Sequence, residues 1–201
     1  MDVKTAEKIV SGMELLGERD GRRLRTLEGN HWWDVYLTAK CVTSFWHFLW
    51  YGAYWEARHE YYPGLHRRMA DFLQDWRVDD GFGQLVPVNL KFLIASRELC
   101  KTQMGLLWGV WRCVRDTNTR GLIRAWTAPK AEEIMLTMRS VFESPRFQQR
   151  FPWVRPSRRG GTVNAEMWGK DGLKLQRSVL VRTPSIEAVG HGKDPTGGPF
   201  H

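Results

Sequence analysis

A lysine and a threonine, Lys101 and Thr102, follow a short polar loop and come just before a long apolar segment. The loop follows residues 88–94, which are rich in types that favour β-strands. In a strand, loop and helix of this kind, the loop amides bind phosphate, the lysine reaches the outer phosphates and the threonine ligates magnesium. The usual pattern is G-x-x-x-x-G-K-[ST], and Ala95 and Cys100 occupy its glycine positions here. The sequence predicts a degenerate phosphate loop; the alternative is an incidental Lys-Thr pair at a strand-to-helix turn.

Hydrophobic periodicity predicts the elements around this loop. Helices are expected at residues 3–17, 65–76, 104–114 and from Pro129 through Phe142. In the second of these helices, the apolar face consists of Leu65, Met69, Phe72, Leu73 and Trp76. Strands are expected at 88–94, 122–126, 173–181 and through Val189, with an exposed basic loop over 144–161. Strand, loop, helix, strand and helix in this order predict a doubly wound α/β fold with a mainly parallel sheet and right-handed crossovers.

The aromatic-rich segment 32–55 allows two interpretations. As a helical pair packed on the main domain it belongs to the core, which is the interpretation we favour. As an exposed aromatic surface it would stack on the bases of single-stranded DNA. Its part 42–55 is too short to span a membrane, which takes about 20 apolar residues. The charged N-terminus lacks the apolar core of a secretory signal.

Composition narrows the class of partner. The chain has 201 residues, a formal net charge of +8 and a sequence pI near 9.7, which favours a polyanionic partner such as nucleic acid over an excess that serves only solubility. Its 42% hydrophobic content and eleven tryptophans exclude disorder of the whole chain. Three cysteines without C-x-x-C spacing suggest a reducing cytosol, and the scattered histidines do not predict a zinc site.

Several stretches in order, over roughly the last two thirds of the chain, resemble the N-terminal ATPase domain of the large terminase subunit of tailed bacteriophages. The loop resembles the family's P-R-x-x-x-K-[ST] variant. Other similar stretches are the helix at 65–73, the helix-to-strand segment 111–123, Phe151-Pro152, Trp168, and the runs 182–190 and 196–201. In the family the last run leads into the Walker B strand. The chain therefore resembles the front of a large terminase, without Walker B or the nuclease domain.

The resemblance implies a P-loop NTPase-like fold, incomplete, with a helical region at 1–80 and a partial ATPase core at 81–201. It implies ATP and Mg²⁺ as cofactors and ATP-driven packaging of double-stranded DNA into procapsids, in an infected or prophage-carrying host cytoplasm. The implied partners are the portal protein, the small terminase subunit and further copies in a ring. Hydrolysis by this chain alone is not expected.

The resemblance also implies roles for individual residues. The nucleotide would be held by Ala95, Ser96, Arg97, Glu98, Leu99, Cys100, Lys101 and Thr102, with Thr102 on magnesium. Lys101 and Arg97 would stabilise charge on the phosphates, and Arg182 or Arg177 would be supplied to a neighbouring subunit. Arg155, Arg158 and Arg159 are expected to face DNA. The remaining alternatives are another phosphate-loop enzyme, such as a helicase-like motor or a small-molecule kinase, and a non-enzymatic remnant that serves as a DNA-binding or interaction module.

Overall fold

The computed structural model divides the chain into two compact units between Trp108 and Gly109, inside one helix. It describes residues 1–19, 31–53, 63–75, 77–79, 84–87, 100–159, 162–163, 168–178 and 183–190. The strand predicted at 88–94 lies outside these residues, and the domain boundary predicted after residue 80 stays a prediction. No helix in the described part of the chain is long and apolar enough to cross a membrane.

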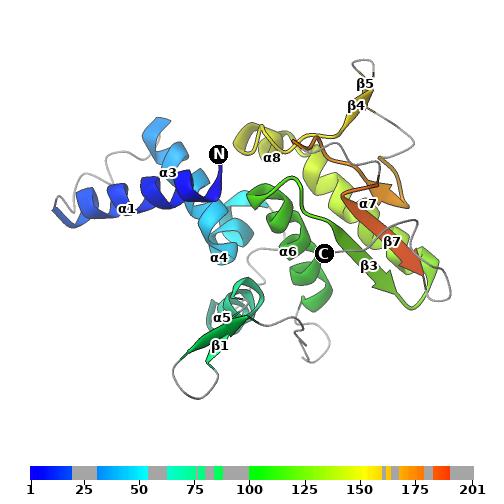
Figure 1. Cartoon of the computed structure of the whole chain (residues 1–201), viewed down its shortest axis with the longest axis horizontal. Coiled ribbons are helices and arrows are strands. Elements are labelled where there is room, and N and C mark those ends of the chain that lie inside the picture. The colour runs from blue at the N-terminus through cyan, green and yellow to red at the C-terminus, as the bar shows by residue number, and fades with distance from the viewer. Residues whose placement is uncertain are drawn as a thin grey trace. The chain divides into compact units, whose positions relative to one another are not determined.

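The first unit opens with two helices that lie side by side, α1 (Val3–Arg19) and α3 (His31–Thr43) (Figure 1). The predicted amphipathic helix at 3–17 is confirmed, and the side chain of Ala6 on α1 is fully buried. An ion pair between Lys40 of α3 and Glu14 of α1 joins the two helices at their surface. On α3, the buried residues Ala39, Cys41 and Val42 gather toward the C-terminal end.

The chain then turns through α4 (Phe45–His47) into a π-helical turn, η1 (Phe48–Gly52). The turn carries an i to i+5 bond, from the Ala53 amide to the Phe48 carbonyl at 2.8 Å. Phe45, Phe48 and Leu49 are fully buried, so one face of this aromatic segment belongs to the core as expected. The segment is therefore helical as predicted, with a change of helical pitch in its middle.

Helix α5 (Pro63–Gln74) packs against α4, and its Gln74 side chain accepts a 2.7 Å hydrogen bond from the Phe45 amide. The predicted helix is confirmed, and its predicted apolar face is correct for Met69 but wrong for Leu65 and Phe72. The buried residues are His66, Met69 and Ala70, whereas Leu65 and Phe72 are exposed. The buried face of α5 therefore includes the polar His66, which hydropathy alone does not predict. Strands β1 (Arg77–Asp79) and β2 (Leu85–Pro87) form an antiparallel pair after α5.

Helix α6 (Lys101–Arg115) contains the division between the units: its first part clusters with the first unit and its last part with the second. The helix predicted at 104–114 is confirmed, and its buried residues lie on one broad face. The buried side chains are Met104, Leu106, Leu107, Val110, Trp111, Cys113 and Val114. Arg112 and Arg115 lie in its last turn, where positive charge suits the helix dipole, and no acidic residue lies in its first turn.

The second unit is built on a mixed sheet of strands β3 (Gly121–Ala125), β7 (Ile186–Gly190) and β6 (Gly172–Leu173), in that order. Strands β3 and β7 are parallel, with Ile123 opposite Ala188, and β6 is antiparallel to β7. Helix α7 (Ala128–Glu143) follows β3 and packs on both β3 and β7 (Figure 1). This is the strand, helix and parallel strand expected of an α/β unit. The larger doubly wound sheet of a P-loop NTPase stays a prediction.

Helix α7 begins where the sequence predicts, because Thr127 caps it and Pro129 lies in its first turn. Of the apolar face that its periodicity predicts, Ile134 is half-buried and the other members are buried, namely Ala131, Met135, Met138, Val141 and Phe142. At the carboxyl end of β7, Gly190 lies so close to the helix start that a Cβ atom there would be 2.5 Å from the Ala128 amide nitrogen. The glycine is therefore required by close packing of strand on helix.

The prediction of an exposed loop over residues 144–161 is wrong in its first part. Residues Pro145–Arg150 form helix α8, and Phe147, Phe151 and Val154 are buried. The cause is local: the Ser144 backbone (φ −57°, ψ 126°) ends α7, and Pro145 then starts a new helix. After α8 the chain turns at Pro152–Trp153, and β4 (Arg158–Arg159) pairs antiparallel with β5 (Thr162–Val163).

Candidate functional site

The predicted phosphate loop meets the described structure at Cys100. Among the residues the structure describes, Cys100 is the only non-glycine residue with a positive φ, +52°. This is the left-handed region, in which glycine is favoured because a Cβ atom costs about 1–2 kcal/mol there. The Cys100 carbonyl accepts the first helical bond, from the Met104 amide at 2.8 Å, so the left-handed residue immediately precedes α6.

The first turn of α6 presents side chains of the kinds that bind phosphate and magnesium. Lys101 is half-buried and Thr102 is exposed. A left-handed residue followed by a helical one points successive amides toward one place, and such nests bind anions. The other predicted loop residues lie outside the described part of the chain, and so does Arg182; the loop residues are Ala95, Ser96, Arg97, Glu98 and Leu99.

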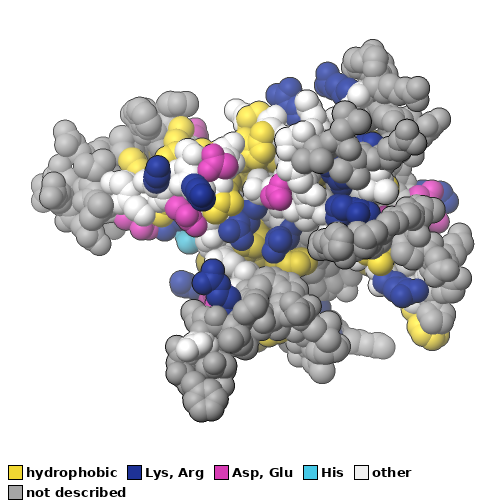
Figure 2. Space-filling model, viewed as in Figure 1, with side chains coloured by type: hydrophobic (Ala, Val, Ile, Leu, Met, Phe, Trp, Pro, Cys, Tyr) yellow, Lys and Arg dark blue, Asp and Glu magenta, His cyan; other side chains and the backbone are white. Residues whose placement is uncertain are grey.

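Two of the predicted DNA-contacting arginines are exposed. Arg155 and Arg158 are on the extended segment after α8, and Arg155 donates a 2.5 Å bond from its Nε to the Pro152 carbonyl. For Arg159 only the backbone is described. On the face drawn in Figure 2, Lys and Arg side chains lie interspersed with Asp and Glu rather than gathered into one patch of the described residues. Any contact of these arginines with DNA stays a prediction.

Arg177, considered above for a neighbouring subunit, is engaged within its own unit. Its guanidinium donates to the Ser185 hydroxyl at 3.1 Å and to the Pro184 carbonyl at 2.9 Å, with a longer bond to the Thr183 carbonyl. Burial, and next the positive charge of Arg120, lower the pKa of Arg177. These contacts give Arg177 a structural role: it fixes the approach to β7.

The cysteines form no disulfide, as expected from their odd number and spacing. Burial raises the pKa of Cys113 to about 12, so its thiol is not a nucleophile at neutral pH. The Cys41 thiol is buried and donates to the His47 carbonyl at 3.6 Å. Within the described residues, no group of three His, Cys, Asp or Glu side chains could hold a metal ion.

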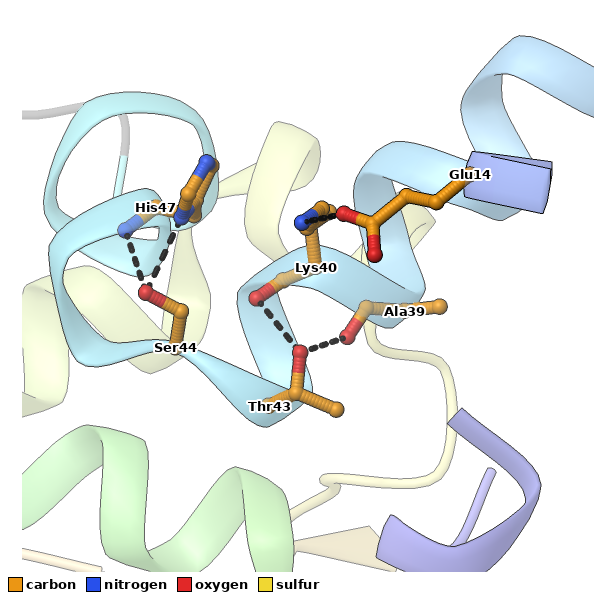
Figure 3. Close-up of polar contacts among 6 residues, drawn as sticks. All are labelled: Glu14, Ala39, Lys40, Thr43, Ser44 and His47. Atoms are coloured by element: carbon orange, nitrogen blue, oxygen red, sulfur yellow. Dashed lines mark hydrogen bonds and ion pairs between the residues drawn. The ribbon is translucent and has the colours of Figure 1, made fainter. Parts of the chain in front are cut away.

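Sequence reasoning did not single out a second cluster, which lies around His47 in the first unit. Ser44 caps α4: its hydroxyl accepts from the His47 amide at 3.4 Å and shares a 2.9 Å hydrogen bond with the imidazole Nδ1 (Figure 3). One residue earlier, in the last turn of α3, the Thr43 hydroxyl donates a 3.1 Å hydrogen bond to the Ala39 carbonyl. Ser44 thereby fixes the orientation of the imidazole.

Burial is the main cause that lowers the pKa of His47, and the positive charges of Lys40 and Arg67 add to it while Glu14 opposes it. The imidazole is therefore neutral at neutral pH. It forms one wall of an open pocket of about 330 Å³, together with Trp46, Trp50 and Tyr51. The sequence signal for this cluster was the aromatic run at 45–51, which did not reveal which rings face outward.

Comparison with protein-family models, with curated proteins and with solved structures found no match to this chain.

Proposed function

We propose that this chain is the N-terminal ATPase portion of a DNA-packaging motor of the large-terminase type, and that it binds the phosphates of ATP at the start of α6. The observation that carries the proposal is the positive φ of Cys100, directly before Lys101 and Thr102. The phosphate-loop pattern places a glycine at this position. Residue 100 adopts a backbone conformation that favours glycine, although it is a cysteine.

Backbone strain of this kind costs about 1–3 kcal/mol and persists where the surrounding structure requires it, most often at binding sites. An ordinary helix start does not need it. Helix α7 of the same chain begins from Thr127 in an extended conformation (φ −126°, ψ 150°), whose hydroxyl accepts from the Lys130 amide. The start of α6 is thus unusual in a way that a phosphate-binding nest accounts for.

The side chains fit the chemistry of a magnesium nucleotide. Lys101 would contact the outer phosphates, the amides from Cys100 onward would bind phosphate oxygens, and the Thr102 hydroxyl would ligate magnesium. The positive end of a helix of 15 residues adds to the attraction for an anion. Magnesium supplies neutralisation of charge on the phosphates. Arg97 and Arg182 keep the charge-stabilising roles that the terminase resemblance implies.

Transport of double-stranded DNA requires a basic surface, and the net charge of +8 and the exposed Arg155 and Arg158 are consistent with one. Because phosphate contacts release counterions, replacing Arg155 and Arg158 by Ala is expected to make duplex binding less dependent on salt. The portal, the small subunit and a ring of copies remain the partners proposed for the complete motor.

The test is calorimetric titration of ATP with magnesium into the wild-type chain and three variants. Lys101→Ala is expected to abolish measurable binding, and Cys100→Gly to keep it, because glycine adopts the required φ without strain. Lys130→Ala is the matched control: this lysine also lies in the first turn of a helix, but α7 is capped by Thr127.

Binding that survives in Lys101→Ala, or that is lost equally in Lys130→Ala, would contradict the site. A folded wild-type chain that binds no ATP would reject the nucleotide function and favour the non-enzymatic remnant.

A further inference from the structure

The segment formed by α4 and η1 has aromatic side chains on two opposite faces. Phe45, Phe48 and Leu49 have no solvent exposure and belong to the core of the first unit. Trp46 and Trp50 are half-buried, and Tyr51 is 45% exposed to solvent. Core packing accounts for the first face only. The second face leaves large aromatic rings in contact with solvent, which in a folded domain indicates an interaction surface.

These outward rings form the walls of the pocket described above. Trp46 and Trp50 meet edge to face with ring centroids 5.6 Å apart, and Tyr51 and the imidazole of His47 complete the lining. At about 330 Å³ the pocket is at the small end of ligand sites, which suits one planar ring system. The π-helical turn brings Trp50 and Tyr51 to the pocket, and π-helical turns are frequent at functional sites.

The charged residues near the pocket favour an anionic ligand over a cationic one. Lys40 and Glu14 form an ion pair, so their charges largely offset each other, and the exposed Arg67 also acts on the His47 imidazole with positive charge. The four described lining residues include no carboxylate. An aromatic cage for a quaternary ammonium ion would place a cation in this positive field. A base attached to an anionic phosphate backbone can stack on the aromatic rings, and its phosphate is attracted by the positive charge.

We propose that the pocket formed by Trp46, His47, Trp50 and Tyr51 binds a base of a single-stranded nucleic acid, with the exposed Arg67 attracting the neighbouring phosphate. Stacking on aromatic rings beside basic residues is the usual way in which single strands bind without strict sequence preference. The proposal adds a site to the first unit and does not depend on ATP binding at α6.

The experiment measures binding of a fluorescent single-stranded oligo(dT) by anisotropy, with a duplex of the same length in parallel. Tyr51→Ala removes an exposed ring and is expected to bind oligo(dT) roughly five- to a hundredfold more weakly, the range found when one stacking aromatic is removed. Tyr51→Phe keeps the ring and is expected to bind like the wild type. Duplex binding is expected to be equal in all three proteins, because paired bases are already stacked.

Trp126→Ala is the matched control, since Trp126 is 80% exposed and lies outside the pocket; oligo(dT) binding should not change. Lys101→Ala should also leave it unchanged, so this proposal and the ATP proposal fail separately. Equal affinity of Tyr51→Ala and the wild type for oligo(dT), or no binding by the folded wild type, would overturn the proposal. The same titration with oligo(rU) separates DNA from RNA as the preferred strand.

Discussion

Each unit of this protein contains a group of aromatic residues, and the two groups are used differently. In the second unit, Phe142, Phe147 and Phe151 are fully buried, with neighbouring ring centroids 5.6 Å and 4.9 Å apart. The indole nitrogens beside them are satisfied: Trp153 donates to the Val114 carbonyl at 3.0 Å, and Trp168 donates to Glu143 at 2.8 Å. This group is a closed core.

In the first unit the corresponding group is open on one side. Phe45 and Phe48 are buried like their counterparts, but Trp46, Trp50 and Tyr51 line a pocket that opens to solvent. The comparison teaches that aromatic content alone does not separate packing from binding. What separates them is whether the rings are covered on all sides.

The largest expected effect tests whether the closed group is the one that stabilises the protein. Phe142→Ala should lower the free energy of unfolding by about 3–5 kcal/mol, because it removes a buried ring and leaves a cavity. Tyr51→Ala, in the open group, should change it by less than about 0.5 kcal/mol. Urea denaturation followed by circular dichroism measures both. Similar losses in the two variants would remove the distinction between the groups.

A second test concerns the hydrogen bond from Trp168 to Glu143. Trp168→Phe keeps a buried ring but removes the indole donor, and should cost about 1–2 kcal/mol, less than for a fully buried partner because Glu143 is 43% exposed and regains water. Trp126→Phe makes the same chemical change at a site that is 80% exposed, and should be nearly neutral. If both variants are neutral, the bond does not help to close the core.

The elements that the sequence predicted best are those whose periodicity and end signals agree. For α7, Pro129 and a regular apolar stripe both point to one helix, and the structure adds Thr127 as its cap. Prediction failed where such signals conflict. Residues 144–161 were predicted as an exposed basic loop, although Pro145, after Ser144, starts α8. In α5, His66 is buried and the more hydrophobic Leu65 is exposed.

The sites were less predictable, for physical reasons. Lys101 and Thr102 can be identified from their spacing, but glycine is the sequence signal for a positive φ, and Cys100 lacks it. The pocket in the first unit depends on η1, whose i to i+5 bonding shifts the direction of Trp50 and Tyr51 relative to an α-helix. A run of aromatic residues carries no pattern from which that shift could be deduced.

The smallest expected effect is a difference in pH dependence between the two groups. His47, at the open pocket, has a pKa lowered mainly by burial and further by Lys40 and Arg67, against the opposing charge of Glu14. In the unfolded chain His47 has its ordinary pKa of 6.5. Just below that pH, the unfolded chain therefore binds more protons at His47 than the folded protein does. The free energy of unfolding should therefore fall as the pH decreases from about 7.5 to about 5.5, and His47→Gln should make this dependence shallower.

At the closed core the sign is the same but the pH range differs. Burial raises the pKa of Glu143, but the hydrogen bonds from Arg139 and Trp168 lower it by more, so it lies below 4.5 in the folded protein. Its contribution is fully present above that pH and is lost only under more acidic conditions. Glu143→Gln should consequently keep the wild-type slope between about pH 7.5 and 5.5, where His47→Gln does not. Parallel slopes for the wild type and His47→Gln in urea titrations would show that the imidazole at the pocket is no more desolvated when folded than when unfolded, and that the open group has no acid sensitivity of its own.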